Sequence, residues 1–235
     1  MVKTENGYVP GMLSTPPDET AVQSTVFGHL PIIFDARVLR PRPWTVAQSR
    51  WAAELLRTSP GSQRVLELCA GAGHIGLLAL ALADARSAAG HVLVSVDVNP
   101  AATEFVRRNA EAAGIGPRVD ARVGSVGEVL APDEQFDLVI ADPPWVPRVE
   151  TVRFPDDPVV AIDGGTDGLD IVRACIGACE NHLMPGGSVL LQLGSVSQAR
   201  RVQDILRSSE SVLSLQKIRT FGAHGVVVRL QAGRA

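Results

Sequence analysis

Short apolar runs alternate with stretches of helical periodicity from residue 64 onward. The apolar runs predict buried strands at residues 64–68, 91–96, 118–123, 136–141 and 188–193. Apolar residues spaced three or four apart predict helices between them, at residues 74–86, 101–113, 168–183 and 197–209. Parallel strands need a crossover connection, which is usually a helix, so the alternation predicts an α/β fold with a doubly wound, mainly parallel sheet.

The C-terminal pattern differs, because two strand-like runs follow one another without a helix between them. They cover residues 211–219 and 225–230. Consecutive strands joined by a short loop pair in the antiparallel sense. We therefore expect an antiparallel hairpin at one edge of the sheet.

The region before residue 64 carries weaker signals. Residues 1–29 show neither the strand nor the helix period and predict an irregular arm. Two short apolar runs at 30–34 and 37–39 flank Asp35-Ala36, which predicts a hairpin. Helical spacing then predicts a helix over residues 45–58.

The composition fits one sizeable domain. The chain has 235 residues, of which 46% are hydrophobic, so a single sheet with its helices can bury a large core. We expect residues 30–235 to form this domain. Within it, the hairpin and helix of residues 30–60 are expected to be a lid over a core formed by residues 61–235.

The charge balance shows no general attraction for polyanions. The formal net charge is −3 at pH 7, although 20 of the 22 basic residues are arginine, which suits local contacts with acidic groups. The chain contains neither a run of 18 apolar residues nor a secretory signal pattern, so a cytoplasmic protein without a membrane partner is expected. Cys175 and Cys179 lack a histidine partner, so we expect core packing and no metal site.

Candidate chemistry lies where the predicted strands end, because open α/β sheets bind ligands outside the carboxyl ends of their strands. The first strand leads through Glu67 into a glycine-rich turn that ends at Gly76, and the second strand ends in Asp97. Glycines let the backbone approach a ligand closely, and an aspartate can accept hydrogen bonds from both hydroxyls of a ribose. The pattern favours an adenosine-containing ligand. It also fits the dinucleotide fingerprint, so an NAD(P)-dependent oxidoreductase is a distant alternative.

The fourth strand ends in the sequence Asp142-Pro143-Pro144-Trp145. Two prolines remove two backbone donors, so nearby carbonyl groups are free to accept hydrogen bonds. An amide or amino NH₂ group could donate to the Asp142 carboxylate and the Pro143 carbonyl while it stacks on Trp145. That arrangement suits methylation of a nitrogen. In the alternative, the prolines only end a strand and Trp145 belongs to the core.

These segments together resemble a known family. The motifs are Glu67-x-x-x-Gly71-x-Gly73, Asp97-x-Asn99-Pro100 and Asp142-Pro-Pro-Trp145. They are similar to class I S-adenosylmethionine-dependent methyltransferases, and most closely to the HemK/PrmC family of protein glutamine amide methyltransferases. Residues 35–45, 163–169 and 183–187 resemble that family as well. The resemblance covers roughly residues 30 to 230, and it implies a Rossmann-like, seven-stranded sheet with an antiparallel last strand.

The resemblance also implies S-adenosylmethionine as the cofactor and a set of site residues. Asp97 would bind the ribose, Val98 would pack on adenine, and Thr45 would approach the methionine portion. The expected cofactor-binding residues are Thr45, Glu67, Cys69, Ala70, Gly71, Gly73, His74, Asp97, Val98, Ser125 and Asp142. The expected catalytic residues are Asp142, Pro143 and Trp145, and the expected substrate-binding residues are Arg42, Pro144, Trp145 and Arg148.

The chain departs from the family pattern at several positions. The family usually has glycine at Cys69, asparagine at Asp142, tyrosine at Trp145 and an acid at Trp44. Bacterial release-factor methyltransferases also carry a helical recognition domain ahead of the hairpin, where this chain has non-periodic residues, so efficient release-factor methylation is not expected. The expected acceptor is a nitrogen of a protein side-chain amide or of a small molecule, and a nucleic-acid amino group is the less favoured alternative.

Overall fold

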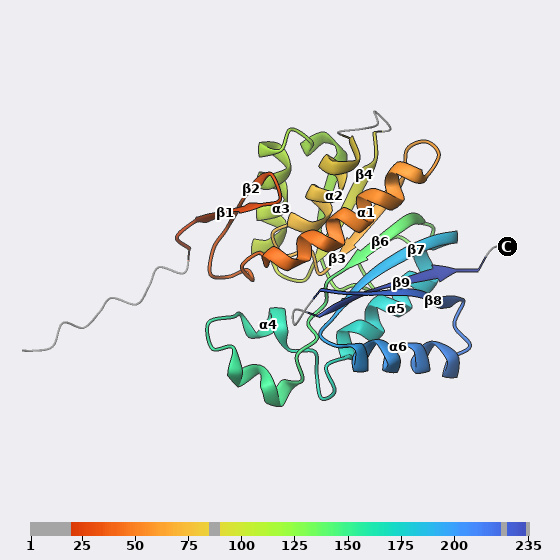
Figure 1. Ribbon diagram of the computed structural model, residues 1–235. Helices are drawn as coiled ribbons and strands as arrows, with labels where there is room; N and C mark the ends of the chain where they lie inside the picture. The colour runs from red at the N-terminus through yellow and green to blue at the C-terminus, as the bar shows by residue number, and fades with distance from the viewer. Residues whose placement is uncertain (1–19, 85–89, 222–224, 234–235) are drawn as a thin grey trace, which may run out of the picture.

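The computed structural model describes residues 20–84, 90–221 and 225–233, and it contains the predicted sheet (Figure 1). Its seven strands are β3 (Arg64–Leu68), β4 (Val92–Asp97), β5 (Val119–Val123), β6 (Phe136–Ala141), β7 (Leu183–Leu193), β8 (Leu213–Thr220) and β9 (Val226–Ala232). They are arranged in the order β5-β4-β3-β6-β7-β9-β8. Strand β9 runs antiparallel to both of its neighbours, whereas the other paired strands run parallel. The prediction of a doubly wound sheet with an antiparallel last strand is therefore confirmed.

Helices cover both faces of the sheet (Figure 1). One face carries α1 (Val46–Thr58), α2 (His74–Asp84) and α3 (Pro100–Ala112), and the other carries α5 (Asp170–His182) and α6 (Val196–Ser208). Because both faces are covered, the central strands are buried and read as near-continuous apolar runs. Cys175 and Cys179 lie on the buried side of α5, in the apolar cluster that α5 and α6 form with the sheet, so the expectation of core packing is confirmed.

The hairpin before the core lies elsewhere than predicted. Strand β1 (Gln23–Phe27) pairs with β2 (Leu30–Phe34) through a two-residue turn at Gly28 and His29, where Gly28 has a left-handed φ of +63°. The prediction of an irregular arm is therefore wrong for β1, and residues 1–19 of that arm lie outside the described residues. The predicted hairpin around Asp35 is also wrong, since the Asp35 carboxylate instead accepts hydrogen bonds from the backbone N–H and the guanidinium of Arg37.

The polar sequence of β1 explains why its period was missed. Only Phe27 of this strand is buried, and Val26 is 76% exposed, so no apolar alternation marks it. The hairpin is nevertheless attached to the core. Asn109 of α3 accepts the Ile33 N–H and donates to the Ile33 carbonyl and to the carbonyl of Ala72. This side chain therefore joins β2, α3 and the loop that follows β3.

Four short elements were not predicted. They are the 3₁₀ helices η1 (Pro43–Thr45), η2 (Gly116–Arg118) and η3 (Arg148–Arg153) and the single-turn helix α4 (Val159–Ile162). The last two follow β6 and stand beside the carboxyl ends of the central strands (Figure 1). Within the described part of the chain, the helices lack the length and the apolar character that a bilayer-spanning helix requires.

Candidate active site

A cleft of about 600 Å³ lies at the carboxyl ends of β3, β4 and β6. This is the edge of the sheet at which α/β proteins bind ligands. Its lining comes from the loops after these three strands, from residues 37–42 after β2, from residues 125–127 after β5, from residues 159–163 and from α5. A volume of this size accommodates a ligand as large as a nucleoside with an amino-acid side chain.

The loop after β3 has an unusual backbone. Cys69, Gly71 and Gly73 all lie in the left-handed region, with φ values of +58°, +53° and +75°. Residues with side chains adopt this region at an energetic cost, so the strain falls on Cys69. Cys69, Ala70, Gly71 and His74 line the cleft as expected, whereas Gly73 forms the turn into α2 behind them.

Asp97 lies at the end of β4 and lines the cleft. Its carboxylate accepts the N–H of Gly71 at 2.8 Å through one oxygen and the N–H of Asn99 at 2.9 Å through the other. Burial raises the pKa of Asp97, and these backbone donors act against that rise. Each carboxylate oxygen has two acceptor sites, so two remain for a ligand. Two acceptor sites on one carboxylate suit a pair of neighbouring hydroxyl groups.

Glu67, an expected cofactor-binding residue, is not among the residues that line the cleft. Its side chain is 2% exposed, lies outside the cleft lining, and accepts hydrogen bonds from the Gly76 N–H at 2.7 Å and the Ser95 hydroxyl at 2.8 Å. Burial raises its pKa to about 7. A Cβ atom on Gly76 would stand 2.6 Å from this carboxylate. Gly76, the last glycine of the apparent dinucleotide fingerprint, therefore makes room for the Glu67 side chain.

Thr45 is also absent from the cleft lining. Its hydroxyl donates to the Arg42 carbonyl at 2.9 Å, and the residue is 2% exposed, so it stabilises the turn of η1. His74 does line the cleft, and its ring stands edge-on to Phe27 with 4.7 Å between centroids. Burial lowers the pKa of His74 to about 3, which keeps its imidazole neutral.

Val98 and Ser125, which the sequence resemblance places among the cofactor-binding residues, both line the cleft. Val98 is 53% exposed and therefore offers an apolar surface to a ligand. The Ser125 hydroxyl donates a hydrogen bond to the Glu128 carboxylate at 2.7 Å. Glu128 itself does not line the cleft, so this acid is bonded to a lining residue without being one. The sequence analysis missed the opposite walls, where Val38 and Leu39 come from the segment after β2 and Ile171 comes from α5. No short-range motif marks these residues.

Asp142 lines the cleft at the end of β6, and among the described residues its carboxylate has no hydrogen-bond partner. Burial raises the pKa of Asp142 to about 7. Ala141, the residue before Asp142, is held in place by a side chain of α1. The Gln48 side-chain amide donates hydrogen bonds to the carbonyl groups of Ala141 and Leu190, both at 3.0 Å. An acceptor group therefore stands ready at a fixed position in the cleft.

Trp145 packs against a segment far along the chain. Its ring packs against Gly194, where a Cβ atom would lie 2.4 Å from the ring, and its carbonyl accepts a hydrogen bond from Gln198 at 2.8 Å. Trp145 is not among the residues that line the cleft. Pro144 does line it, and Pro143 is buried. Stacking of an acceptor on Trp145 therefore stays a prediction, and the lining of the cleft gives it no support.

The two predicted substrate arginines have different positions. Arg42 lines the cleft and forms an ion pair with Asp157 at 2.6 Å. Arg148 has a side chain that is 67% exposed, pairs with Asp163 at 2.9 Å, and lies outside the lining. Asp163 itself does line the cleft, and the Gly165 N–H and Arg148 lower its pKa.

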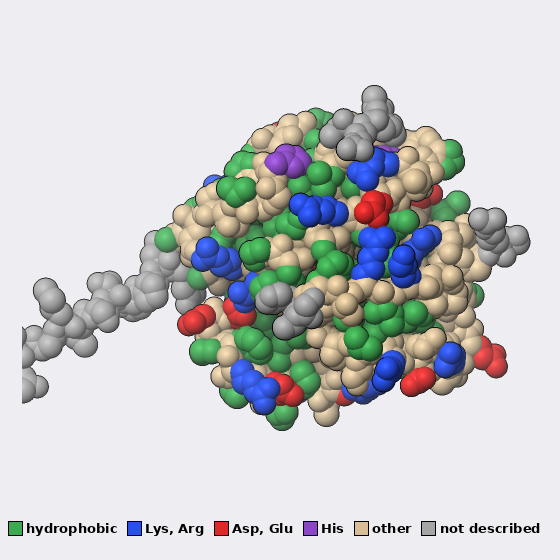
Figure 2. Space-filling model, viewed as in Figure 1, with side chains coloured by type: hydrophobic (Ala, Val, Ile, Leu, Met, Phe, Trp, Pro, Cys, Tyr) green, Lys and Arg blue, Asp and Glu red, His purple; other side chains and the backbone are tan. Residues whose placement is uncertain are grey.

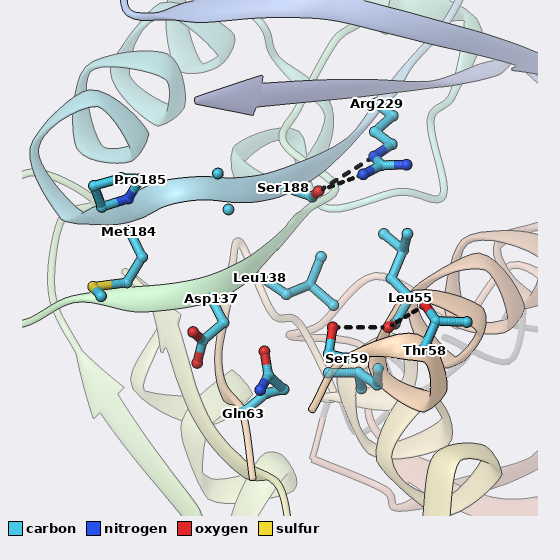
Figure 3. Close-up of a pocket in the computed structure, with 13 residues that line it drawn as sticks. Leu55, Thr58, Ser59, Gln63, Asp137, Leu138, Met184, Pro185, Ser188 and Arg229 are labelled. Atoms are coloured by element: carbon cyan, nitrogen blue, oxygen red, sulfur yellow. Dashed lines mark hydrogen bonds between the residues drawn. The ribbon is translucent and has the colours of Figure 1, made fainter. Parts of the chain in front are cut away.

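A second cavity of about 230 Å³ lies at the amino-terminal ends of β3 and β6 (Figure 3). Its polar side chains are largely satisfied by the protein, since Thr58 and Ser59 donate to the Leu55 carbonyl and Arg229 donates to Ser188. The Asp137 carboxylate accepts the backbone N–H of Arg64 at 2.7 Å. This cavity is at the other end of the strands from Asp97 and Asp142, so the candidate site is the larger cleft.

Comparison with known proteins agrees with this geometry. The family model described as "Methyltransferase small domain" matches residues 48–154. A release factor glutamine methyltransferase of Gloeobacter violaceus is 34% identical over 73% of this chain and 59% of its own length. A ribosomal protein uL3 glutamine methyltransferase of Bradyrhizobium diazoefficiens is 31% identical over 70% of this chain and 53% of its own length. The chain thus spans somewhat over half the length of these two relatives.

The fold is shared with solved methyltransferase structures. The N-terminal domain of human METTL16, solved in complex with SAH, superimposes with a TM-score of 0.63 at 14% identity and covers 88% of this chain and 76% of that one. The strand order of the sheet, the family model and the relatives all indicate a methyltransferase. These similarities support a class I S-adenosylmethionine-dependent methyltransferase that is close to the HemK/PrmC family.

Proposed function

We propose that this protein transfers a methyl group from S-adenosylmethionine to the nitrogen of a side-chain amide in a protein. The observation that carries the proposal is the partly buried carboxylate of Asp142, which lies in the same cleft as Asp97 and has no hydrogen-bond partner among the described residues. The relatives support a protein amide as the acceptor, because they are named for glutamine methylation in a release factor and in ribosomal protein uL3.

The cleft fits the cofactor. Asp97 would hold the ribose through its two remaining acceptor sites, Val98 would pack against the adenine, and the loop from Cys69 to Gly71 would border the methionine portion. The bound cofactor would supply an electrophilic methyl group. Residues 37–42 form part of the same wall, which supports the proposal that residues 30–60 are a lid over the core.

The residues of the chain account for the remaining chemistry. An amide NH₂ group placed in the cleft donates one hydrogen bond to the Asp142 carboxylate and one to the Pro143 carbonyl, which orients the nitrogen lone pair toward the methyl group. The nitrogen gains positive charge as the methyl arrives. The ionised carboxylate stabilises that charge more in the transition state than before it, and it can accept the departing proton. Gln48 contributes by holding the strand end on which Asp142 stands.

Two measurements test this function. Calorimetry should show binding of S-adenosylmethionine, and tight NADH binding in its place would contradict the methyltransferase assignment. Incubation with methyl-labelled S-adenosylmethionine and the separated protein, RNA and metabolite fractions of a cell extract should place the label in protein. Digestion of the labelled protein should then release a methylated glutamine or asparagine amide. Label in a lysine or in RNA would contradict the proposed acceptor.

A further inference from the structure

The segment that follows the Asp142 loop presents apolar side chains to solvent. Of the twelve large hydrophobic residues that are exposed in the described part of the chain, five lie within residues 149–160. The most exposed of these five are Val149 at 81%, Val152 at 80%, Val159 at 61% and Val160 at 60%. We call these four residues the valine surface. Scattered exposed valines are normal, whereas a concentration of them beside a cleft marks an interaction site.

The local structure turns these valines outward. Val149 and Val152 belong to the 3₁₀ helix η3, in which residues three apart lie on the same face. Glu150 and Arg153 are also three apart, and they form an ion pair at 2.8 Å. The helix therefore displays one apolar stripe and one paired polar stripe. Figure 2 shows hydrophobic side chains interspersed with charged ones over the region that Figure 1 labels α4.

Half of the valine surface borders the cleft itself. Val159 and Val160 of α4 line it together with Asp142 and Pro144. The segment is held there at both ends, since Val146 exchanges backbone hydrogen bonds with Ile162 and Gly164 at 3.0 and 2.8 Å. The segment that carries all four valines thus begins and ends beside residues of the cleft.

The charges around the valine surface disfavour a nucleic acid. Arg148 is paired with Asp163 at 2.9 Å, Arg153 with Glu150, and Arg42 with Asp157 at 2.6 Å. A nucleic-acid backbone is bound by cations that neutralise several phosphates. Arg40 at the cleft has no acidic partner among the described residues, but it lies over the ring of Phe34 with its guanidinium carbon 5.9 Å from the centroid. One such cation is too few for a phosphate chain.

We propose that the valine surface binds the polypeptide of a protein substrate through apolar side chains next to the target amide, and so selects protein over nucleic acid. This inference rests on the proposed function. A side-chain amide carries no net charge, so electrostatic attraction does not bring it to Asp142. Apolar contacts made by its neighbours hold the segment while the amide enters the cleft.

The test is a double substitution, Val149→Asp with Val152→Asp, neither of which lines the cleft. The probes are the protein and RNA fractions of a cell extract, with methyl-labelled S-adenosylmethionine as donor. We expect label in protein, with an apparent KM for the protein acceptor at least tenfold higher in the double variant. The rate at saturating acceptor and the S-adenosylmethionine Kd should stay within twofold of wild type.

Matched controls separate this surface from general effects of charge. Val212→Asp changes a valine that is 61% exposed between α6 and β8, and it should behave as wild type. Val149→Ser with Val152→Ser should raise KM less than the aspartates do. Raising NaCl from about 50 to about 200 mM should change KM for protein less than threefold, whereas phosphate binding would weaken by orders of magnitude.

Two results would overturn the inference. The first is a double variant whose KM for the protein acceptor is unchanged. The second is an equal rise of KM in Val212→Asp, which would make the effect one of overall charge. Failure of the proposed function has a different signature, because label would then enter RNA, or no fraction at all, even with the wild type.

Discussion

Asp142→Asn tests whether the cleft holds a carboxylate that is costly to ionise. Burial raises the pKa of Asp142 from 3.8 to about 7. A carboxyl group whose pKa is higher in the folded than in the unfolded state binds its proton more tightly when folded. Its contribution to stability is therefore complete below about pH 4 and is lost as the pH rises through 7.

The size of the effect follows from the same pKa. Each pKa unit corresponds to about 1.4 kcal/mol, so full ionisation of Asp142 costs the folded protein roughly 4 kcal/mol as an upper limit, and water in the cleft reduces this. Asparagine has nearly the same shape and no charge. We expect Asp142→Asn to change the free energy of unfolding little at pH 4.5 and to raise it by about 1–3 kcal/mol at pH 8.5.

The assay is urea unfolding of both proteins at a series of pH values, without cofactor. Glu67 also has a raised pKa, so the relevant quantity is the difference between variant and wild type and not the slope of either curve. Asp204→Asn is the control, because the Asp204 side chain is 75% exposed and its replacement should shift stability by less than about 0.5 kcal/mol at every pH. A difference between Asp142→Asn and wild type that does not vary with pH would refute the reasoning.

Activity gives an independent measure of the same carboxylate. If the ionised form assists transfer, the wild-type rate should fall as the pH drops through about 7, and this acidic limb should be absent in Asp142→Asn. Asp142→Ala should lose about 10²–10³ in turnover, while Asn, which still accepts a hydrogen bond, should retain more. Equal damage from Asn and Ala would mean that proton acceptance outweighs orientation. Full activity in Asp142→Ala would show that the proline loop only ends a strand.

Three further variants test other parts of the site. Asp97→Ala removes two charged acceptor sites, so calorimetry should show an S-adenosylmethionine Kd raised tenfold or more, and an unchanged Kd would contradict the ribose assignment. Glu67→Ala leaves the Gly76 N–H and the Ser95 hydroxyl without their partner, and unfolding should show a loss of about 2–4 kcal/mol; Glu67→Gln should lose clearly less, and equal losses would contradict this structural role. Trp145→Ala should lower the melting temperature because the ring packs on Gly194, with cofactor affinity unchanged; a variant with normal stability and a raised acceptor KM would show that the ring contacts substrate after all.

The core elements follow from local rules, which explains why the sequence predicted them. A strand buried between two helical layers needs apolar residues at consecutive positions, and β3 and β6 show such runs. The position of Asp97 could be predicted for a similar local reason, because it ends a strand that lies beside a glycine-rich turn. The hairpin of β1 and β2 escaped prediction because its outer strand buries only Phe27. Hydrophobic periodicity alone cannot identify a strand in which only one residue is buried.

The direction in which a side chain points was decided by the tertiary structure. Glu67 and Asp142 both follow the pattern of strand-end acids, yet Ser95 and Gly76 hold Glu67 in the core by hydrogen bonds. The Asp142 carboxylate has no such partner in the part of the chain that the structure describes, and it lines the cleft. Gly194 gives Trp145 a place to pack that no motif around the tryptophan encodes.

The sequence by itself thus determined the succession along the chain of the longer strands and helices from α1 onward, together with the loops that meet at the ligand edge, because these depend on periodicity and on residues close together in the chain. The packing of segments far apart determined which of those residues reach the cleft. Thr45, Glu67, Trp145 and Arg148 each found a partner elsewhere in the described fold, and the walls came from residues 37–42 and from α4. A hydrogen bond or a close contact to a distant residue outweighs a local motif, since a buried polar group left without a partner costs more than a change of rotamer.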